Sequence, residues 1–208
     1  MSVHVSPWGP WDPLSPQDGV TLLSSVSAPW WISGGWAIDL FLGRQTRDHD
    51  DLDVQFLRHD QQVVRAAFAG WDVQAALPQP RSEDWPFRTW EQGDELDPRI
   101  HDIWCRPRTG EPWRVQLMLA DSEDGDWLFR RDPRIRRPVA TIGCWSDDGL
   151  PYLAPEIQLL CKAKVPSRAK DEADFLQVVP HLAPERRSWL RASLAVVCPG
   201  HPWGAALA

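Results

Sequence analysis

Residues 30–56, WWISGGWAIDLFLGRQTRDHDDLDVQF, decide the fold that we predict for this chain. The apolar run 30–32 predicts a short buried strand, and the serine and two glycines at 33–35 predict the turn that ends it. Glycine lets the backbone approach another group closely, and N–H groups at the start of a helix suit a phosphate. The pattern at 36–42 predicts about two turns of helix, ended by Gly43.

The second half of this stretch carries two acids one residue apart. We expect a strand over residues 52–57, and because side chains alternate along a strand, Asp51 and Asp53 should point to the same side. Two neighbouring carboxylates repel each other, and a hard divalent cation removes that repulsion. Mg²⁺ prefers one or two protein carboxylates together with phosphate oxygens. The glycine turn and the acid pair therefore predict a phosphoryl-transfer site with Asp51 and Asp53 as metal ligands.

Residues 34–53 resemble the signature of the DNA polymerase β-type nucleotidyltransferases, in which a glycine turn and a spacer precede two acids that flank an apolar residue. Within that superfamily, the run GGWAIDxxLGRxTRxHDDLD is most similar to the aminoglycoside 2″-adenylyltransferases and lincosamide nucleotidyltransferases. The resemblance implies an α+β fold. It comprises a polymerase β-like core, with a small mixed sheet flanked by helices, followed by a C-terminal helical region.

The resemblance also implies how a nucleotide would bind. Asp51 and Asp53 would hold Mg²⁺ against the triphosphate of ATP, and the residues expected to contact the nucleotide are Ser33, Gly34, Gly35, Arg44, Arg47, His49 and Lys162. The alternative for the loop residues of this set is an ordinary surface loop of ion pairs. The run LLCKAKVPSRAKDEADF resembles a second family segment. Its Lys162, Arg168, Lys170 and Asp171 would form either a phosphate clamp or a helix-capping ion cluster, with Asp171 as the capping residue.

The family usually supplies a third carboxylate from a later strand, as a metal ligand or as the general base for the acceptor hydroxyl. In the corresponding strand, WRVQLML, the chain has Gln116 at that place. Asp102 on the neighbouring strand is the best local substitute. If the two strands form an antiparallel hairpin, Asp102 would face the same cleft and His101 the other side, and either group could take a proton from an alcohol.

The rest of the chain predicts a mixed α/β part followed by helices. Ser15 and Pro16 mark a helix start. Other patterns predict a helix at 60–69, a strand at 71–77, a hairpin of strands at 100–106 and 113–119, and helices at 155–164, at 170 or 171 to 179, and from 184 onward. We expect a nucleotidyltransferase core over residues 1–150 and a C-terminal helical region over residues 151–208.

The composition is that of a globular protein, with 43% hydrophobic and 25% charged residues and a net charge of −7. An acidic balance argues against nucleic acid as the main partner and suits a cationic small molecule. The acidic segments 78–98 and 121–126 are either solvated loops or the rim of an acceptor pocket. The five arginines between 130 and 137 either reach a triphosphate or pair with neighbouring acids. The fourteen tryptophans are expected mainly in packing, with some as stacking surfaces for a substrate.

The sequence shows no recognisable targeting signal and no disulfide-type cysteine pattern, so we expect a cytoplasmic protein. The four cysteines form no C-x-x-C motif and are expected as reduced thiols. The N-terminal residues lack the pattern of a signal peptide, and no apolar run approaches the roughly 20 residues that span a bilayer.

The leading hypothesis is an Mg²⁺-dependent transfer of AMP from ATP to a hydroxyl of a small molecule, with an aminoglycoside-like acceptor as one possibility. A second hypothesis, motivated by Gln116, is a catalytically degenerate homologue that binds nucleotide as a sensor or partner module. A third is a toxin–antitoxin-type transferase acting on tRNA or protein, which the acidic balance disfavours. The oligomeric state and the identity of the acceptor stay open.

Overall fold

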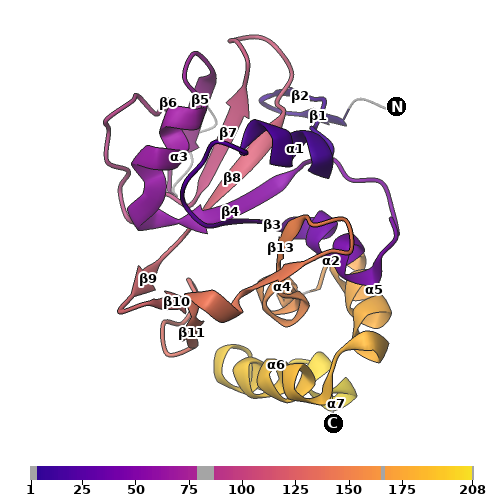
Figure 1. Cartoon of the computed structure of the whole chain (residues 1–208). Helices are drawn as coiled ribbons and strands as arrows, with labels where there is room; N and C mark the ends of the chain where they lie inside the picture. Colours follow the sequence, from indigo (N-terminus) through magenta and orange to yellow (C-terminus); the bar gives the residue numbers. More distant parts are fainter. Residues whose placement is uncertain (1–3, 79–86, 165–166, 208) are drawn as a thin grey trace.

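The structure is a computed structural model that describes residues 4–78, 87–164 and 167–207. Its centre is a mixed sheet (Figure 1) in the strand order β12-β13-β3-β4-β8-β7-β5-β6. The pairs β13/β3 and β4/β8 are parallel and the others are antiparallel. In this order the strands are Gly143–Trp145, Pro151–Leu153, Trp30–Ile32, Asp53–Leu57, Val115–Ala120, Asp102–Arg106, Asp72–Ala76 and Phe87–Thr89. An α+β fold is thereby confirmed.

The stretch that begins the sequence analysis forms β3, helix α2 (Gly34–Leu42) and β4, as predicted. The helix begins at Gly34, two residues earlier than the pattern suggested, so the diglycine forms its first turn. Gly43 ends the helix in the left-handed conformation, with φ of 66°. Because β4 lies between β3 and β8, the strand that carries Asp53 is an interior strand of the sheet.

One face of the sheet is apolar and is covered by the first and third helices, α1 (Pro16–Leu22) and α3 (Gln61–Ala67). The buried side chains of this face alternate along the central strands, as a half-buried strand requires. They include Val54, Phe56, Ile103 and Leu117, and they share one hydrophobic cluster with Leu23, Val64 and Phe68. This cluster holds β4, β7 and β8 in register.

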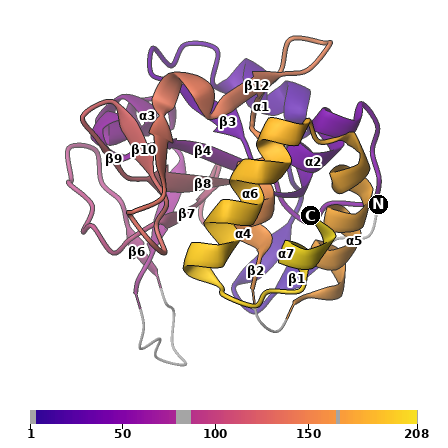
Figure 2. The ribbon, with the colours of Figure 1, turned by 90° about the horizontal axis from the view of Figure 1, so that it is seen from below.

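The C-terminal helices pack together on the other side (Figure 1), with the C-terminus among them. They are α4 (Pro155–Lys162), α5 (Ala169–Val178), α6 (Pro184–Val197) and α7 (Trp203–Ala206). Their apolar side chains form a second cluster that also contains Trp31, Ile38 and Leu57 of the core. Seen from below (Figure 2), α6 crosses in front of α4. The division at residue 150 stays a prediction; β13, which follows it, pairs with β3 in the main sheet.

Smaller elements complete the described part of the chain. Two minor sheets consist of β1 (His4–Ser6) with β2 (Gly9–Trp11), and of β9 (Ser122–Glu123), β10 (Asp126–Leu128) and β11 (Arg136–Pro138). Three short 3₁₀ turns are Arg58–Asp60, Val139–Thr141 and Val179–His181. The predicted helix start is confirmed, because Ser15 Oγ accepts a 3.1 Å hydrogen bond from the N–H of Asp18.

The remaining predicted elements are present with ends shifted by a few residues. The short strands β1, β2, β6, β9, β10, β11, β12 and β13, the three 3₁₀ turns and α7 were not predicted. Residues 79–86 of the acidic segment 78–98 lie outside the described residues. Among the described residues, all four cysteines are free thiols. No helix in the described part of the chain combines the length and the apolar character that crossing a membrane requires.

Candidate active site

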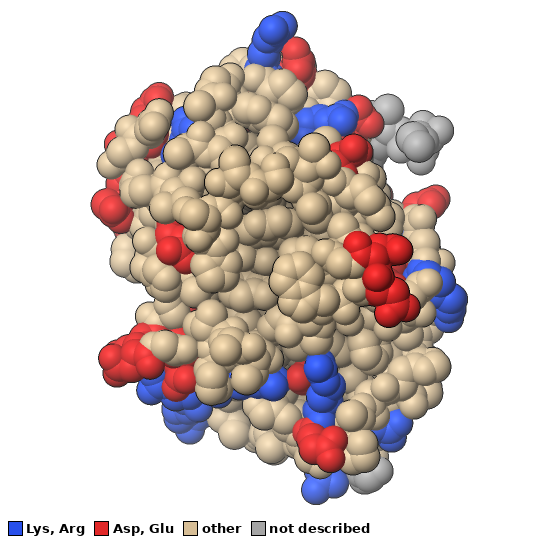
Figure 3. Space-filling model, in the orientation of Figure 1, with Lys and Arg blue, Asp and Glu red and all other residues tan. Residues whose placement is uncertain are grey.

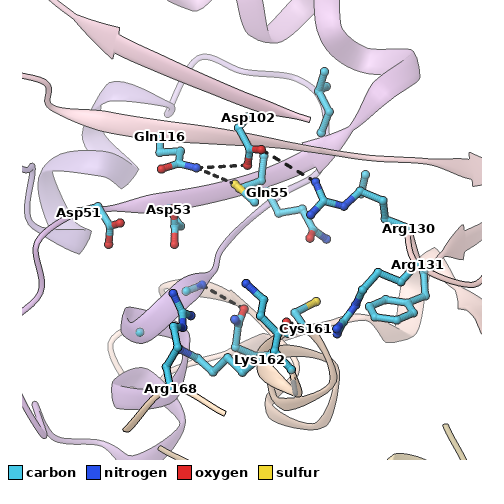
Figure 4. A pocket seen from close by; sticks show the side chains of 18 of the residues that line it. Asp51, Asp53, Gln55, Asp102, Gln116, Arg130, Arg131, Cys161, Lys162 and Arg168 are labelled. Atoms are coloured by element: carbon cyan, nitrogen blue, oxygen red, sulfur yellow. Dashed lines mark hydrogen bonds and ion pairs between the residues drawn. The ribbon is translucent and has the colours of Figure 1, made fainter. Parts of the chain in front are cut away.

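A cavity of about 440 Å³ lies between the polar face of the sheet and the helices α4 and α5. Asp51 and Asp53 both project into it from the start of β4 (Figure 4). Asp53 is the first residue of the strand and Asp51 precedes it by two, so the expected common direction of the two carboxylates is found. Their separation by one residue places both on the cavity side.

The glycine turn fits closely around Asp53. Gly34 has a φ of +67°, a conformation that favours glycine. A side chain at this position would also overlap the Asp53 carboxylate. The backbone of the turn is tied to the strand, because the N–H of Ser33 donates a 2.8 Å hydrogen bond to the carbonyl oxygen of Asp53. The turn and the acid pair therefore form one compact unit, with glycine required where the carboxylate lies.

Burial raises the pKa of Asp53 well above its ordinary value, and repulsion from Asp51 adds to the effect. Lys162 and Lys170 act in the opposite direction but do not outweigh these two causes. Among the ion pairs of the described residues, none engages either carboxylate. A half-buried carboxylate that makes no ion pair and has a second carboxylate beside it fits a divalent cation.

These two oxygen donors would hold Mg²⁺, with nucleotide phosphates and water as its other ligands. In the described part of the chain, no three His, Cys, Asp or Glu side chains gather into a complete metal site. A cation here would therefore depend on the substrate for much of its coordination, which is the usual behaviour of Mg²⁺.

The backbone N–H groups of the turn are arranged differently from the prediction. The N–H of Ser33 is already used within the fold, so the structure does not support Ser33 as a phosphate ligand through that group. The N–H of Gly34 donates a 3.0 Å hydrogen bond to Oε1 of Gln158 on α4. Gly34 and Gly35 line the cavity, as does Gln158. No local pattern points to Gln158, because 124 residues separate it from Gly34 along the chain.

Of the three residues predicted to bind nucleotide from the loop between α2 and β4, one lines the cavity and two do not. Arg47 lines the cavity and lies 3.5 Å from the carboxylate of Asp174. Arg44, contrary to the prediction, turns to α5 and donates a 3.2 Å hydrogen bond to Oε1 of Gln177. It is not among the residues that line the cavity.

His49 is also placed away from the cavity, contrary to the prediction. Its Nε2 lies 2.5 Å from Oδ2 of Asp39, and 2% of its side chain is exposed. The ring packs against Trp36 with centroids 4.3 Å apart. Thr46 donates a 2.5 Å hydrogen bond to the other oxygen of the same carboxylate. His49 therefore fastens the loop to α2, and it supports the site without reaching into it.

Lys162 lies on the opposite wall, with 7% of its side chain exposed, and its Nζ is 2.8 Å from Asp174 and 3.4 Å from Asp171. Arg168 donates hydrogen bonds of 2.6 and 3.0 Å to Asp171. These contacts fit the interpretation of the segment as an ion cluster. The Asp171 side chain does not cap the helix, so the capping part of that interpretation is wrong. Lys162, Arg168 and Lys170 nevertheless line the cavity, which is the position that a phosphate clamp requires.

The predicted hairpin is confirmed and brings Asp102 to the cavity. The register places Gln116 opposite both Asp53 and Trp104, and places Asp102 opposite Met118. Gln116 Nε2 donates a 3.3 Å hydrogen bond to Oδ1 of Asp102 (Figure 4). Asp102 Oδ2 also lies 3.9 Å from Arg130.

His101 faces away from this cavity, as expected because it directly precedes Asp102 and side chains alternate along a strand. Its Nδ1 lies 3.1 Å from Arg58 Nη2. Burial lowers the pKa of His101, and the positive charge of Arg130 adds to that effect. Of the two candidate bases, Asp102 is therefore the one in place.

The five arginines between 130 and 137 fall into two groups, those that line the cavity and those that form ion pairs elsewhere. Arg130 and Arg131 line the cavity. The other three pair with acids, as the alternative interpretation predicted, and these pairs are Arg134 with Asp132, Arg136 with Glu123 and Asp126, and Arg137 with Glu156.

Acidic side chains of the described parts of segments 78–98 and 121–126 do not line the cavity. Several pair with arginines instead, namely Asp94 with Arg88, Asp97 with Arg99, and Asp121 with Arg58. On the face shown in Figure 3, acids lie in several small separate groups, some of them beside bases. For these described residues, the interpretation as solvated surface loops fits the contacts, and the alternative of an acidic rim around an acceptor pocket does not, because their charges lie in local ion pairs.

The diglycine turn, the paired acids and the basic wall on a mixed sheet define a nucleotidyltransferase of the DNA polymerase β type. The chain belongs to the aminoglycoside 2″-adenylyltransferase and lincosamide nucleotidyltransferase family. The family model for aminoglycoside-2″-adenylyltransferase matches residues 19–105. A lincosamide resistance protein of Staphylococcus haemolyticus is 36% identical over 141 residues, which cover 67% of this chain and 76% of that protein.

Other similarities are more local or concern the fold alone. A 2″-aminoglycoside nucleotidyltransferase of Escherichia coli is 52% identical over 44 residues, 18% of this chain and 25% of that protein. The crystal structure of ANT(2″)-Ia with adenylyl-2″-tobramycin has a TM-score of 0.54 at 20% identity, over 85% of this chain and 93% of that one. Lincomycin-bound LnuA has a TM-score of 0.50 at 16% identity, over 78% and 95%.

Proposed function

We propose that this protein transfers AMP from ATP to a hydroxyl group of a small molecule, in a reaction that requires Mg²⁺, and that the acceptor is an antibiotic, as the names of its relatives suggest. The observation that carries the proposal is the pair Asp51 and Asp53 facing a basic wall across one cavity. A triphosphate placed between them would meet carboxylate-held metal on one side and fixed cations on the other.

The protein groups have separate tasks in this reaction. Bound Mg²⁺ would neutralise phosphate charge as the reaction proceeds. Arg47, Lys162 and Arg168 would hold the β- and γ-phosphates, since nucleotidyl transfer depends mainly on positioning and charge stabilisation. The acceptor oxygen bonds to the α-phosphorus, the bond to the bridging oxygen breaks, and pyrophosphate leaves.

The proton of the acceptor hydroxyl has to move to a base during this step. We assign that role to Asp102, which lines the cavity. A general base must lie within hydrogen-bond reach of the proton that it takes, and Asp102 is the carboxylate at the end where the hydroxyl would enter. Gln116 would hold the Asp102 carboxylate through its hydrogen bond.

Pyrophosphate release tests this function. The purified protein is mixed with ATP, Mg²⁺ and a panel of hydroxylated antibiotics that includes tobramycin and lincomycin. We expect release that depends on both metal and acceptor and that is lost in Asp53→Asn, while Asp124→Asn, in an exposed turn, retains it. Release without any acceptor would contradict the proposal.

The second candidate function is the binding module that Gln116 motivates. Its signature is distinct, because the protein would bind a non-hydrolysable ATP analogue with Mg²⁺ and release no pyrophosphate with any acceptor. The two functions are therefore separated by measuring binding and turnover on the same preparation.

A further inference from the structure

The cavity has two chemically different ends. One end, beside the glycine turn, carries Arg47, Arg168 and Lys170. The other end lies where β8 and β10 approach α4, and most of its lining is apolar. The apolar residues there are Met118, Leu119, Ala120, Trp127, Leu128 and Phe129. The polar side chains at this end are few, so each of them constrains what can bind.

The chemistry of the reaction assigns the ends. Pyrophosphate leaves from the α-phosphorus on the side opposite to the incoming oxygen, so that the attacking and leaving oxygens are roughly in line. The basic end suits the pyrophosphate group. The acceptor then approaches from the other end, past Asp102.

Two buried hydrogen-bond donors in this second region have no partner. Gln55 Nε2 and Trp127 Nε1 make no hydrogen bond, although 8% and 2% of these residues are exposed. Both residues line the cavity. The Gln55 side chain extends from β4 into the space between Asp102 and Lys162 (Figure 4). Buried donors without partners are costly, and a ligand that supplies oxygen acceptors would satisfy them.

Fixed charge at the same end is positive. Arg130 lies beside Asp102 at 3.9 Å, and Arg131 donates a 2.7 Å hydrogen bond to the carbonyl oxygen of Ala163 at the end of α4. Among the described residues lining this end, Asp102 is the carboxylate present, and Arg130 lies 3.9 Å from it. One ammonium group could pair with Asp102, but the further charges of a polycation would meet Arg130 and Arg131 with no second carboxylate at this end to pair with.

We propose that the acceptor is an oxygen-rich compound with an apolar face and at most one ammonium group, and that Gln55 and Arg130 select it against polycations. This inference rests on the proposed function, because it assumes that the second end receives the acceptor. It also explains why an acidic protein does not use its surface acids at the site. The same donors could instead meet the nucleoside, and the experiment distinguishes the two sources.

The first measurement is binding, so that it does not depend on turnover. Lincomycin and tobramycin are titrated by calorimetry into the protein saturated with Mg²⁺ and a non-hydrolysable ATP analogue. We expect lincomycin to bind about ten-fold or more tightly than tobramycin. Tighter binding of tobramycin, or binding of neither compound, overturns the proposal even if nucleotide is bound and the protein is otherwise competent.

The second measurement uses charge variants at the site. Arg130→Glu is expected to lower the lincomycin-to-tobramycin affinity ratio about ten-fold, and Gln55→Glu to lower it in the same direction, because each adds a carboxylate at the acceptor end. The matched controls are Arg134→Glu, an exposed arginine in the same turn, and Gln17→Glu, an exposed residue of α1. An unchanged ratio in Arg130→Glu with a normal melting temperature overturns the proposal.

The third measurement separates acceptor from nucleoside. Gln55→Leu removes the unpartnered donor with little change in volume. We expect weaker lincomycin binding at unchanged affinity for the ATP analogue. Weaker analogue binding with unchanged lincomycin binding would assign Gln55 to the nucleoside and overturn its role in acceptor choice.

Discussion

Gln116 donates a 3.3 Å hydrogen bond to Asp102 while lying directly opposite Asp53 in the parallel register of β4 and β8. The amide thus stands between two acids and separates their charges. We expect Gln116→Glu to place three carboxylates side by side and to lower the stability of the metal-free protein by about 1–3 kcal/mol. Mg²⁺ should restore more stability to the variant than to the wild type. Urea denaturation with and without Mg²⁺ measures this, and equal responses to metal would contradict it.

Asp102→Asn tests the base. The side chain keeps its shape but cannot take a proton, so we expect kcat to fall by about 10²–10⁴-fold while the KM for ATP changes little. Steady-state kinetics on pyrophosphate release provide both constants. Asp124→Asn, at a turn residue with φ of 50°, is the control with the same chemical change outside the cavity. A proportional rise in KM with unchanged kcat would assign Asp102 to binding.

Gly34→Ala and Gly43→Ala form a matched pair. Both glycines have nearly the same positive φ, 67° and 66°, so both variants carry a similar backbone strain. At Gly43 a side chain would meet no atom, whereas at Gly34 it would overlap the Asp53 carboxylate. We expect both variants to lose about 1 kcal/mol or more of stability. Only Gly34→Ala should also lose activity and Mg²⁺ binding; equal activity losses in the two would refute the role of the turn.

Variants at Arg47 and His49 distinguish a residue that contacts the nucleotide from one that only stabilises the loop. Arg47→Ala removes a cavity cation, so we expect a higher KM for ATP at nearly unchanged thermal stability. His49→Ala leaves one oxygen of the buried Asp39 carboxylate without its partner, while Thr46 still donates to the other, so we expect a loss of about 1–3 kcal/mol in stability and a smaller change in KM. Chemical denaturation and steady-state kinetics on both variants decide the matter. A large KM effect in His49→Ala at unchanged stability would place His49 at the nucleotide.

The ion cluster on α5 predicts a pH dependence. Burial alone would raise the pKa of Asp171, but the hydrogen bond from Arg168 and the charge of Lys162 outweigh burial and lower it below 3.8. The stabilising contribution is therefore present above the ordinary carboxyl pKa and is lost as the pH falls through the lower, folded-state value. Asp171→Asn should be less stable near neutral pH and should lose less stability below about pH 4. The measurement is the free energy of unfolding of both proteins as a function of pH. Curves that run parallel for the variant and the wild type would contradict the prediction.

The sequence predicted those parts of the site that neighbours along the chain determine. The turn at 33–35, the helix that follows and the strand beginning near Asp53 depend on local patterns, and the structure contains them. The hairpin that carries Asp102 follows from alternation and a turn. Of the three loop residues predicted to contact the nucleotide, Arg44, Arg47 and His49, only Arg47 lines the cavity, and the sequence did not distinguish it from the other two.

What the sequence did not predict depends on contacts between distant segments. The His49 ring is buried because it pairs with Asp39 on α2, and nothing in the sequence of the loop itself indicates this burial. Gln158 approaches Gly34 only because α4 packs on α2. One interpretation of the acidic segments was a rim for a cation, but their arginine partners cannot be identified from composition. Net charge therefore described the surface and not the cavity.

Arg130 and Arg131 are consecutive, yet they reach opposite walls of the cavity, the first towards β7 and the second towards the last carbonyls of α4. A single stretch of backbone thus fixes the spacing between sheet and helix where the acceptor would enter. Inserting one residue between them should widen the mouth, and deleting one should narrow it. The length of this turn, more than the identity of any wall residue, would then determine the bulk of molecule that a relative of this enzyme admits.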